Sequence, residues 1–345
     1  MTSDAPQRAV REFQDIFGRL FEQVGRVIVG HREILEQILV AFFAGGHVLI
    51  EGVPGTGKTL IVRSLGEALN LSFNRIQFTV DLMPADITGT RMVMDQNGRR
   101  EFTFVPGPLF AHVLLADEIN RATPKTQSAL LEAMAELQVT VAGTTYRLEP
   151  PFFVLATLNP IEMEGTYPLP EAQLDRFLFK VVLTYPDHED MQRIIGGTTG
   201  PTLPTIEPVF AREEADKRIQ ALRALVREVI VAPHLEEYAA ALVRATLPAG
   251  SKFAPPGAPV LAADEQIARY VSFGSSPRGG QALLLGAKVR ALLDGRVNVT
   301  YDDIDRVATP ALNHRLVLNF AAVADGIDAR SLIERIVHEA RRIRR

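Results

Sequence analysis

The chain has 345 residues, of which 47% are hydrophobic and 23% are charged, a composition typical of a folded globular protein and not of a disordered one. Its net charge of −4 gives no global reason to expect nucleic acid or an acidic membrane as a partner. The sequence has no cysteine, which excludes disulfide chemistry, and its histidines lack the spacing of a catalytic zinc site. Because the N-terminal segment lacks an apolar core of the signal-peptide type and no apolar run is long enough to span a bilayer, we expect a cytoplasmic location.

The first half of the chain alternates helical patterns with short apolar runs. Two helices are predicted over residues 8–45, with a break at Val29 and Gly30. A buried strand at 47–51, a glycine-rich loop and a helix at 58–70 follow as a strand–loop–helix unit. Short apolar runs between helices favour an α/β fold with a parallel five-stranded sheet covered on both faces. The remaining elements are predicted as strands at 74–79, 112–116, 152–158 and 178–183 and a helix at 124–137.

Two β-hairpins interrupt this pattern. The first spans about residues 87–107, alternates apolar and polar residues, and turns at residues 97–98. Arg99 and Arg100 lie at its tip, where they either contact an acidic surface or only keep the tip soluble. The second hairpin spans residues 138–150.

A change of composition divides the chain. Residues 196–208 are rich in Gly, Pro and Thr and are predicted to form a linker. Residues 1–195 then make one α/β domain that contains both hairpins, and residues 209–345 make a second, all-helical domain. The helices of the second domain are predicted at 211–230, 234–247, 262–273, 278–294, 301–308 and 329–344.

The glycine-rich loop, GVPGTGKT, matches the pattern GxxxxGK[ST] in full. Its glycines let successive backbone N–H groups point into one concavity that holds phosphate oxygens, and the following helix offers its N-terminus to the same anion. Lys58 would reach the β- and γ-phosphates, and the Thr59 hydroxyl would coordinate Mg²⁺. Since a predicted strand precedes the loop and a predicted helix follows it, we predict nucleotide binding and not a glycine-rich turn without a ligand. The predicted nucleotide-binding residues are Gly52, Val53, Pro54, Gly55, Thr56, Gly57, Lys58, Thr59 and Leu60.

Two carboxylates, Asp117 and Glu118, end the apolar strand at 112–116. The carboxyl end of a strand is where α/β proteins bind ligands. Asp117 would hold Mg²⁺ through its water shell, and Glu118 would orient or deprotonate an attacking water. Without the phosphate loop upstream, both would be interpreted as polar residues that end a strand.

The order of three further residues along the chain indicates that they belong to the same site. Asn159 ends the strand at 152–158, and its amide can hold the attacking water near the γ-phosphate. Alone it would be a turn residue, and Arg176 and Arg278 would be surface arginines. The order of phosphate loop, acidic strand, Asn-ended strand, arginine, and a second arginine that opens a helix favours a shared site.

This order of motifs, together with the amino-acid sequence of four segments, resembles the MoxR family of AAA+ ATPases. The resemblance is to the branch of that superfamily with a hairpin inserted into the second helix. The resemblance covers the chain from about residue 8 to the C-terminus and implies a P-loop NTPase core followed by an all-α lid. The segments that carry it are residues 28–59, 114–136, 155–179 and 276–296.

The resemblance implies roles within one subunit. Residues 52–59 correspond to Walker A, in which Lys58 also serves catalysis. Asp117 and Glu118 correspond to Walker B, with Glu118 as the catalytic base. Asn159 corresponds to sensor 1, and Arg278 to sensor 2, which moves the lid with the state of the nucleotide.

The resemblance also implies contacts beyond the subunit. Arg176 corresponds to an arginine finger supplied to a neighbour, which requires a head-to-tail contact and therefore a closed ring, a hexamer in the family. Arg121 is a further candidate to face a neighbour. Val29 and Gly30 lie where the family holds the adenine.

The hairpins fit the inserts of this branch, which project from the ATPase core and can touch a substrate. We therefore expect a chaperone-like remodelling ATPase that uses ATP and Mg²⁺ and acts as a ring on partner proteins. The family implies partners with a von Willebrand A domain and the maturation or activation of metal- or cofactor-dependent enzymes.

Three alternatives remain open from the sequence. The ATPase subunit of a magnesium or cobalt chelatase shares the hairpin insert and the ATP chemistry. A nucleic-acid motor such as a helicase also uses hairpin inserts, although the acidic balance and the absence of an added DNA-binding module disfavour it. A nucleotide-gated switch that scarcely hydrolyses is disfavoured by Glu118 together with Asn159.

Overall fold

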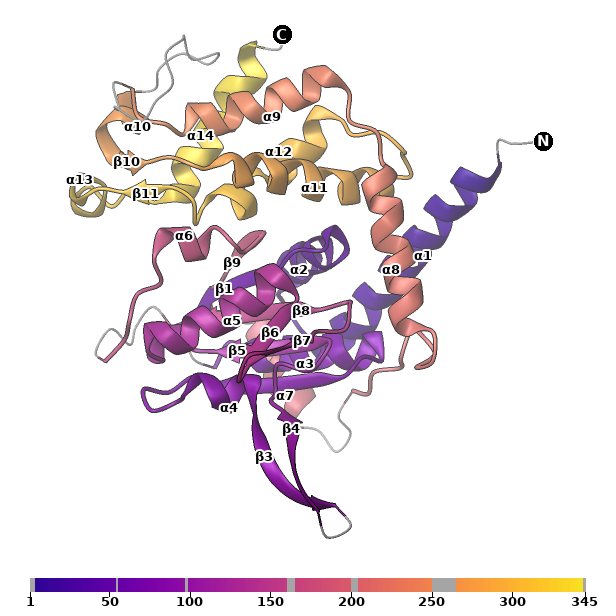
Figure 1. Ribbon diagram of the computed structural model, residues 1–345. Helices are drawn as coiled ribbons and strands as arrows, with labels where there is room; N and C mark the ends of the chain where they lie inside the picture. Colours follow the sequence, from indigo (N-terminus) through magenta and orange to yellow (C-terminus); the bar gives the residue numbers. More distant parts are fainter. Residues whose placement is uncertain are drawn as a thin grey trace.

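The computed structural model describes residues 4–53, 55–96, 99–159, 165–199, 204–249 and 265–343. Pro54 and the turn predicted at residues 97–98 lie outside these ranges. The described chain forms an α/β part and a helical part stacked on it, with a hairpin that projects from the α/β part at the end away from the helices (Figure 1). Among the described helices, none combines the length and the hydrophobicity of a membrane span.

A five-stranded parallel sheet in the order β2-β5-β8-β1-β9 organises the α/β part. Strand β5 is buried along its whole length and β8 along nearly all of it, as expected for strands covered on both faces. The predicted α/β fold with a parallel five-stranded sheet is confirmed. The strands are β1 (Val48–Gly52), β2 (Phe73–Gln77), β5 (Val113–Asp117), β8 (Phe153–Leu158) and β9 (Phe179–Leu183).

Helices cover the sheet, and three of those described in this part, α4, α6 and α7, were not predicted from the sequence. Helix α2 ends where Gly45 adopts φ +78° and donates its N–H to carbonyls of the last turn, a conformation that glycine permits without strain. Helix α7 is an unpredicted helix, capped by Asp187, and it continues to Thr198, three residues into the segment predicted as a linker. The helices of this part are α1 (Asp4–Val27), α2 (Arg32–Ala44), α3 (Lys58–Leu69), α4 (Pro84–Thr88), α5 (Pro124–Glu136), α6 (Glu171–Leu174) and α7 (His188–Thr198), with a 3-10 turn at Ile119–Arg121.

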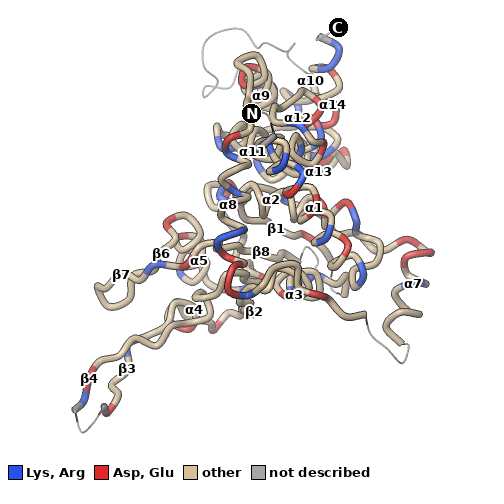
Figure 2. The backbone as a smooth tube through the Cα atoms, turned by 90° about the vertical axis from the view of Figure 1, so that its right-hand side faces the viewer, with Lys and Arg blue, Asp and Glu red and all other residues tan. Residues whose placement is uncertain are grey.

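Both hairpins are present. The first, β3 (Gly89–Gln96) and β4 (Arg99–Pro106), projects from the body in two perpendicular views, and it starts after the short helix α4 that the sequence did not predict (Figures 1 and 2). The second, β6 (Gln138–Val141) and β7 (Thr144–Arg147), turns through two residues with positive φ, as a tight hairpin turn requires. The Phe104 ring stacks on the Tyr146 ring with centroids 3.8 Å apart, which joins the two hairpins at their bases.

The helical part, which forms the lid, also contains a small antiparallel strand pair. The helix predicted over 262–273 ends at Tyr270, because Val271–Phe273 forms strand β10 and pairs with β11 (Val317–Leu318). Residues 262–264 of that prediction lie outside the described ranges. The lid helices are α8 (Ala215–Glu228), α9 (Pro233–Ala245), α10 (Glu265–Tyr270), α11 (Pro277–Leu293), α12 (Tyr301–Leu312), α13 (Phe320–Ala324) and α14 (Ala329–Ile343).

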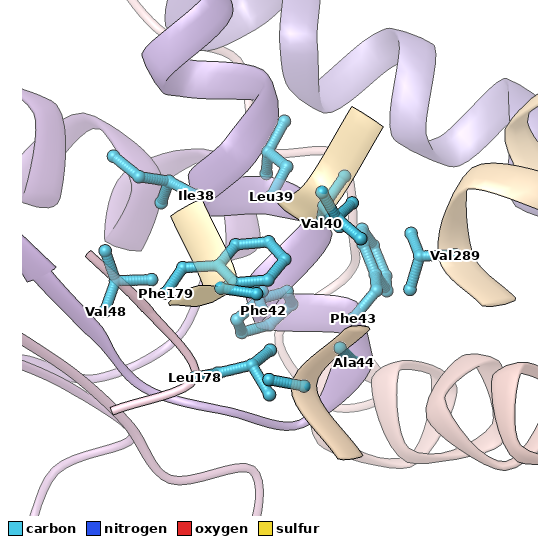
Figure 3. Packing of buried hydrophobic residues seen from close by; sticks show 14 of the residues in the cluster. Ile38, Leu39, Val40, Phe42, Phe43, Ala44, Val48, Leu178, Phe179 and Val289 are labelled. Atoms are coloured by element: carbon cyan, nitrogen blue, oxygen red, sulfur yellow. The ribbon is translucent and has the colours of Figure 1, made fainter. Parts of the chain in front are cut away.

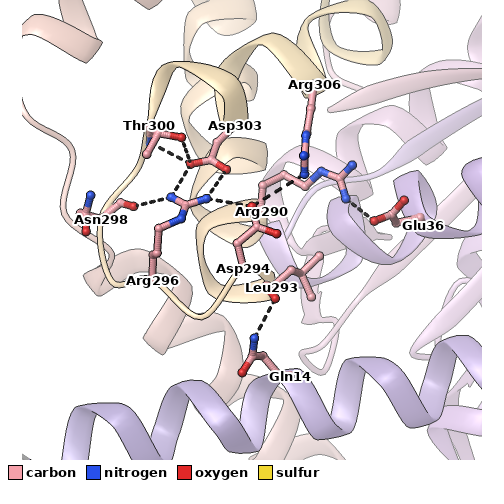
Figure 4. A network of polar contacts seen from close by, with 10 residues as sticks. All are labelled: Gln14, Glu36, Arg290, Leu293, Asp294, Arg296, Asn298, Thr300, Asp303 and Arg306. Carbon is pink, nitrogen blue, oxygen red and sulfur yellow. Dashed lines mark hydrogen bonds and ion pairs between the residues drawn. The ribbon is translucent and has the colours of Figure 1, made fainter.

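One apolar core joins the lid to the sheet. Phe43 of α2 lies between the sheet and Val289 of α11, and Phe179 of β9 belongs to the same cluster (Figure 3). Two polar contacts reinforce the junction: Gln14 donates to the Leu293 carbonyl at 2.8 Å, and Arg290 pairs with Glu36 (Figure 4). The lid is therefore fixed beside α2 and β9 by burial as well as by hydrogen bonds.

The base of the first hairpin depends on Gly89. It has φ +91°, and a Cβ there would lie 2.3 Å from the Val105 carbonyl oxygen. Gly143 in the second hairpin has φ +79° but nothing within 4 Å of such a Cβ. We expect Gly89→Ala to lower the free energy of unfolding by about 3 kcal/mol and Gly143→Ala by about 1–2 kcal/mol, measured by chemical denaturation. Equal losses would contradict the close backbone approach at Gly89.

Candidate functional site

The glycine-rich loop has the geometry of a phosphate cradle. Gly55 and Gly57 adopt φ +82° and φ +85°, so the backbone curls between β1 and α3. Gly57 is the N-cap of α3 and has no side chain to cap the first N–H groups of the helix, which are the groups that bind an anion. The Lys58 Nζ donates to the Gly52 carbonyl at 2.6 Å, across the mouth of the loop. These residues fit the phosphates of a nucleotide.

The two Walker-type carboxylates lie at the end of β5, and a threonine on β8 holds both. The Thr157 hydroxyl donates to Asp117 Oδ1 at 2.6 Å and accepts the Glu118 N–H at 2.8 Å. Asp117 is buried, and Glu118 adopts φ +55°, which turns its side chain away from the strand direction. The sequence analysis missed Thr157. Its signal was a hydroxyl residue inside the otherwise apolar run FFVLATL.

The Glu118 carboxylate is held by two donors on one oxygen. Gln77 donates to Oε2 at 2.8 Å and Arg121 donates to the same oxygen at 2.9 Å. Arg121 is thus turned toward Glu118 of its own chain. Arg75, two residues before Gln77 on β2, donates to Asp117 Oδ2 at 2.7 Å. The sequence analysis missed Arg75 and Gln77, although their spacing in FNRIQ places both on one face of a strand.

The other predicted nucleotide residues surround this edge of the sheet. Thr59 is the second residue of α3, and its hydroxyl with the Asp117 carboxylate makes a set of hard oxygen donors, which fits Mg²⁺. Asn159 is buried directly after β8, between the strands that end at the loop and at Asp117. The predicted adenine residues adjoin α7, because a Cβ on Gly30 would lie 2.5 Å from Asp190 Oδ2.

Arg176 and Arg278 lie elsewhere. Both line a cavity of about 300 Å³ whose walls include Gly46 and His47, immediately before β1, and Phe177, immediately before β9. In a parallel sheet these are the amino ends of the strands, whereas the phosphate loop follows the carboxyl end of β1. At about 3.3 Å per residue, β1 alone separates the two edges by about 13 Å. The structure therefore brings the two arginines together and sets them apart from Lys58, Asp117 and Glu118.

The lining of the cavity carries a net positive charge. Among its described lining residues are three arginines and one carboxylate, Asp175, which pairs with Arg315 at 2.7 Å and accepts from the Ser276 hydroxyl at 2.7 Å. Ser276 is the N-cap of α11, which carries Arg278. Arg176 donates to the Leu131 carbonyl of α5 at 2.5 Å. Arg176 is thus positioned by α5, Arg278 by the first turn of α11, and Arg315 by Asp175.

His47 lines this cavity and adds no charge to it. Complete burial lowers its pKa to about 4, partly opposed by its hydrogen bond with the Met134 carbonyl. Its Nδ1 accepts the Val154 N–H at 3.1 Å, so the other nitrogen carries the proton. The ring is neutral at physiological pH, and the arginines supply the charge of the cavity.

Known proteins resemble this chain along most of its length. The pattern of the ATPase family associated with various cellular activities (AAA) matches residues 47–179, and that of an AAA lid domain matches residues 263–336. Chaperone MoxR1 of Mycobacterium tuberculosis is 41% identical over 92% of this chain and 80% of its own, and protein MoxR of Methylorubrum extorquens is 32% identical over 89% of each. A solved structure of a protein from Cytophaga hutchinsonii superposes with a TM-score of 0.85 and 38% identity over 97% of both chains.

Thr157 provides a test of how the carboxylates are held. Thr157→Val removes one donor from Asp117 and leaves the Glu118 N–H without its acceptor. We expect a loss of about 1–3 kcal/mol in the free energy of unfolding and a fall of about ten- to hundredfold in ATP turnover, because the two carboxylates shift. Thr140→Val, which removes an exposed hydroxyl from the second hairpin, is the matched control and should change neither. Wild-type turnover in Thr157→Val would contradict this positioning role.

Proposed function

Because the chain belongs to the MoxR family of AAA+ ATPases, we propose that it couples ATP hydrolysis in a ring to the remodelling of partner proteins. Residues 1–195 act as the motor core and residues 209–345 as its lid, in the cytoplasm. One observation carries the proposal. The two carboxylates and the phosphate loop lie at one edge of the sheet, and the arginines lie at the other edge. Each edge is half of a catalytic site.

The first half binds and activates the substrate within one subunit. The loop and Lys58 bind the β- and γ-phosphates of ATP, and Val29 with Gly30 receives the adenine. Thr59 and Asp117 would hold Mg²⁺, which supplies neutralisation of the charge that develops on the phosphates. Glu118 takes a proton from the attacking water. Asn159 orients that water, and the burial of its side chain supports a fixed orientation.

The second half is supplied across a subunit boundary. A head-to-tail contact that closes into a ring brings the arginine cavity of one subunit over the phosphate loop of the next. Arg176 then stabilises the transition-state charge as a finger. Since Arg278 lines the same cavity, we propose that it also reads the nucleotide of the neighbour, and not that of its own subunit.

The projecting first hairpin is the proposed contact with a client. It exposes apolar side chains along both strands, together with Arg100, and its base is stacked on the second hairpin through Phe104 and Tyr146. Motion of the core is therefore transmitted to both hairpins together. A protein with a von Willebrand A domain that matures or activates a metal- or cofactor-dependent enzyme is the client class that the family favours. The exposed apolar residues are Met92, Val93, Met94 and Phe102.

A pair of variants tests the remodelling function. Glu118→Gln should bind ATP without hydrolysing it and so hold its client, whereas Lys58→Ala should lose ATP binding. We expect Glu118→Gln, incubated with native lysate, ATP and Mg²⁺, to retain a von Willebrand A-domain protein or a metalloenzyme subunit that Lys58→Ala does not, measured by mass spectrometry.

Other outcomes of this capture point elsewhere. If Glu118→Gln retains nucleic acid at moderate salt and no such protein, the proposed remodelling function is wrong and the chain is a nucleic-acid motor. Unchanged ATP affinity in Lys58→Ala would remove the phosphate-loop assignment itself.

Mixed rings test which subunit supplies each arginine. Arg176→Ala and Arg278→Ala should each bind ATP but hydrolyse it slowly, with a loss of roughly 10³-fold or more for Arg176→Ala. Mixing either variant with inactive Glu118→Gln should restore turnover, because an interface between an intact Glu118 and intact arginines from the other subunit is then complete.

The comparison between the two mixtures is decisive. If the Arg176→Ala mixture regains activity and the Arg278→Ala mixture does not, Arg278 acts within its own subunit. Subunit exchange, followed by energy transfer between labelled subunits, provides the control that mixed rings form.

A further inference from the structure

Arg75 connects the two catalytic carboxylates. It lies on β2, the edge strand next to β5, and its terminal nitrogen donates both to Asp117 Oδ2 and to Gln77 Oε1, each at 2.7 Å. The amide nitrogen of Gln77 in turn donates to Glu118 Oε2 at 2.8 Å. One guanidinium thus contacts Asp117 directly and fixes the orientation of the amide that holds Glu118.

The two oxygens of Asp117 have partners of different kinds. Oδ1 accepts from Thr157, which is completely buried on β8, so this contact is fixed by the core. Oδ2 accepts from Arg75, whose side chain is 47% exposed, against 10% for Asp117. An exposed arginine can leave its partner at little cost, because solvent screens the pair and hydrates the released guanidinium.

A divalent cation and this guanidinium are drawn to the same carboxylate. The hydration shell of Mg²⁺ donates to the oxygens of its acidic ligand, and Arg75 already donates to one of them. Two positive groups at such short range also repel each other. Occupancy of Asp117 by one of them therefore opposes occupancy by the other.

We propose that Arg75 competes with Mg²⁺ for Asp117, so that it sets the metal concentration at which the site loads. When Arg75 leaves Asp117, Gln77 loses the donor that orients its amide, and the hold of Gln77 on Glu118 weakens. This inference rests on the proposed function, because it takes Asp117 as the metal carboxylate.

Metal binding can be measured without turnover. We would titrate Mn²⁺ into the full-length protein with saturating ADP and follow free Mn²⁺ by electron paramagnetic resonance. Arg75→Gln should bind Mn²⁺ roughly three- to fivefold more tightly than the wild type, the size expected for an exposed ion pair. Arg75→Met should do the same, and Arg75→Lys, which keeps the charge, should stay close to the wild type.

Two control variants distinguish a failure of the competition from a failure of the metal assignment. Arg63→Gln removes an equally charged, exposed arginine from α3, where it pairs with Glu67 at 2.8 Å, and should leave Mn²⁺ affinity unchanged. Asp117→Asn should weaken Mn²⁺ binding, and if it does not, the assignment of Asp117 to the metal fails and this inference with it. If Asp117→Asn weakens binding but Arg75→Gln leaves it unchanged or weaker, the competition alone is overturned and the proposed function stands.

Discussion

The apolar core shared by α2, β9 and α11 is the constraint on which the rest of the molecule depends. It packs the lid against the amino ends of the sheet strands, with Phe43 between sheet and lid (Figure 3). Helix α11 of the lid begins at this end of the sheet. Arg278, in its first turn, therefore lines the same cavity as Arg176 and lies far from the phosphate loop. A subunit folded in this way holds the phosphate loop with its carboxylates and the arginine cavity at opposite edges of one sheet, which we propose to be two halves of a catalytic site. In the proposed mechanism, hydrolysis therefore depends on a neighbour because of the burial of apolar side chains, and not because of an arrangement of charges.

The strand order assembles the other half-site. Strand β5, which ends in Asp117, lies between β2 and β8, so residues of both neighbouring strands reach its carboxylates. Thr157 of β8 fixes them from the buried side, and Arg75 and Gln77 of β2 contact them from the exposed edge. The loop after β2 leads through α4 into the first hairpin. The strand that contacts Asp117 and Glu118 is thus the strand that leads to the hairpin proposed to contact the client.

Local patterns explain what could be predicted from the sequence. The phosphate loop is a contiguous motif, and each strand is an apolar run, so the parallel five-stranded sheet followed from the chain alone. Thr157, Arg75 and Gln77 could not be assigned, because their partners are set by strand order, a property of distant segments. The position of Arg278 depends in the same way on tertiary packing. The strand at Val271–Phe273 was taken for the end of a helix because its pairing partner lies more than forty residues away.

The most direct test of this account is the structure of the assembled Glu118→Gln protein with ATP. The account predicts that the guanidinium groups of Arg176 and Arg278 of one subunit lie within hydrogen-bond distance, about 3 Å, of the γ-phosphate held by the next subunit. The nucleotide of each subunit should receive neither arginine from its own chain. Arg278 found on the phosphates of its own subunit would contradict the account, because the lid would then have to leave the core it shares with α2 and β9.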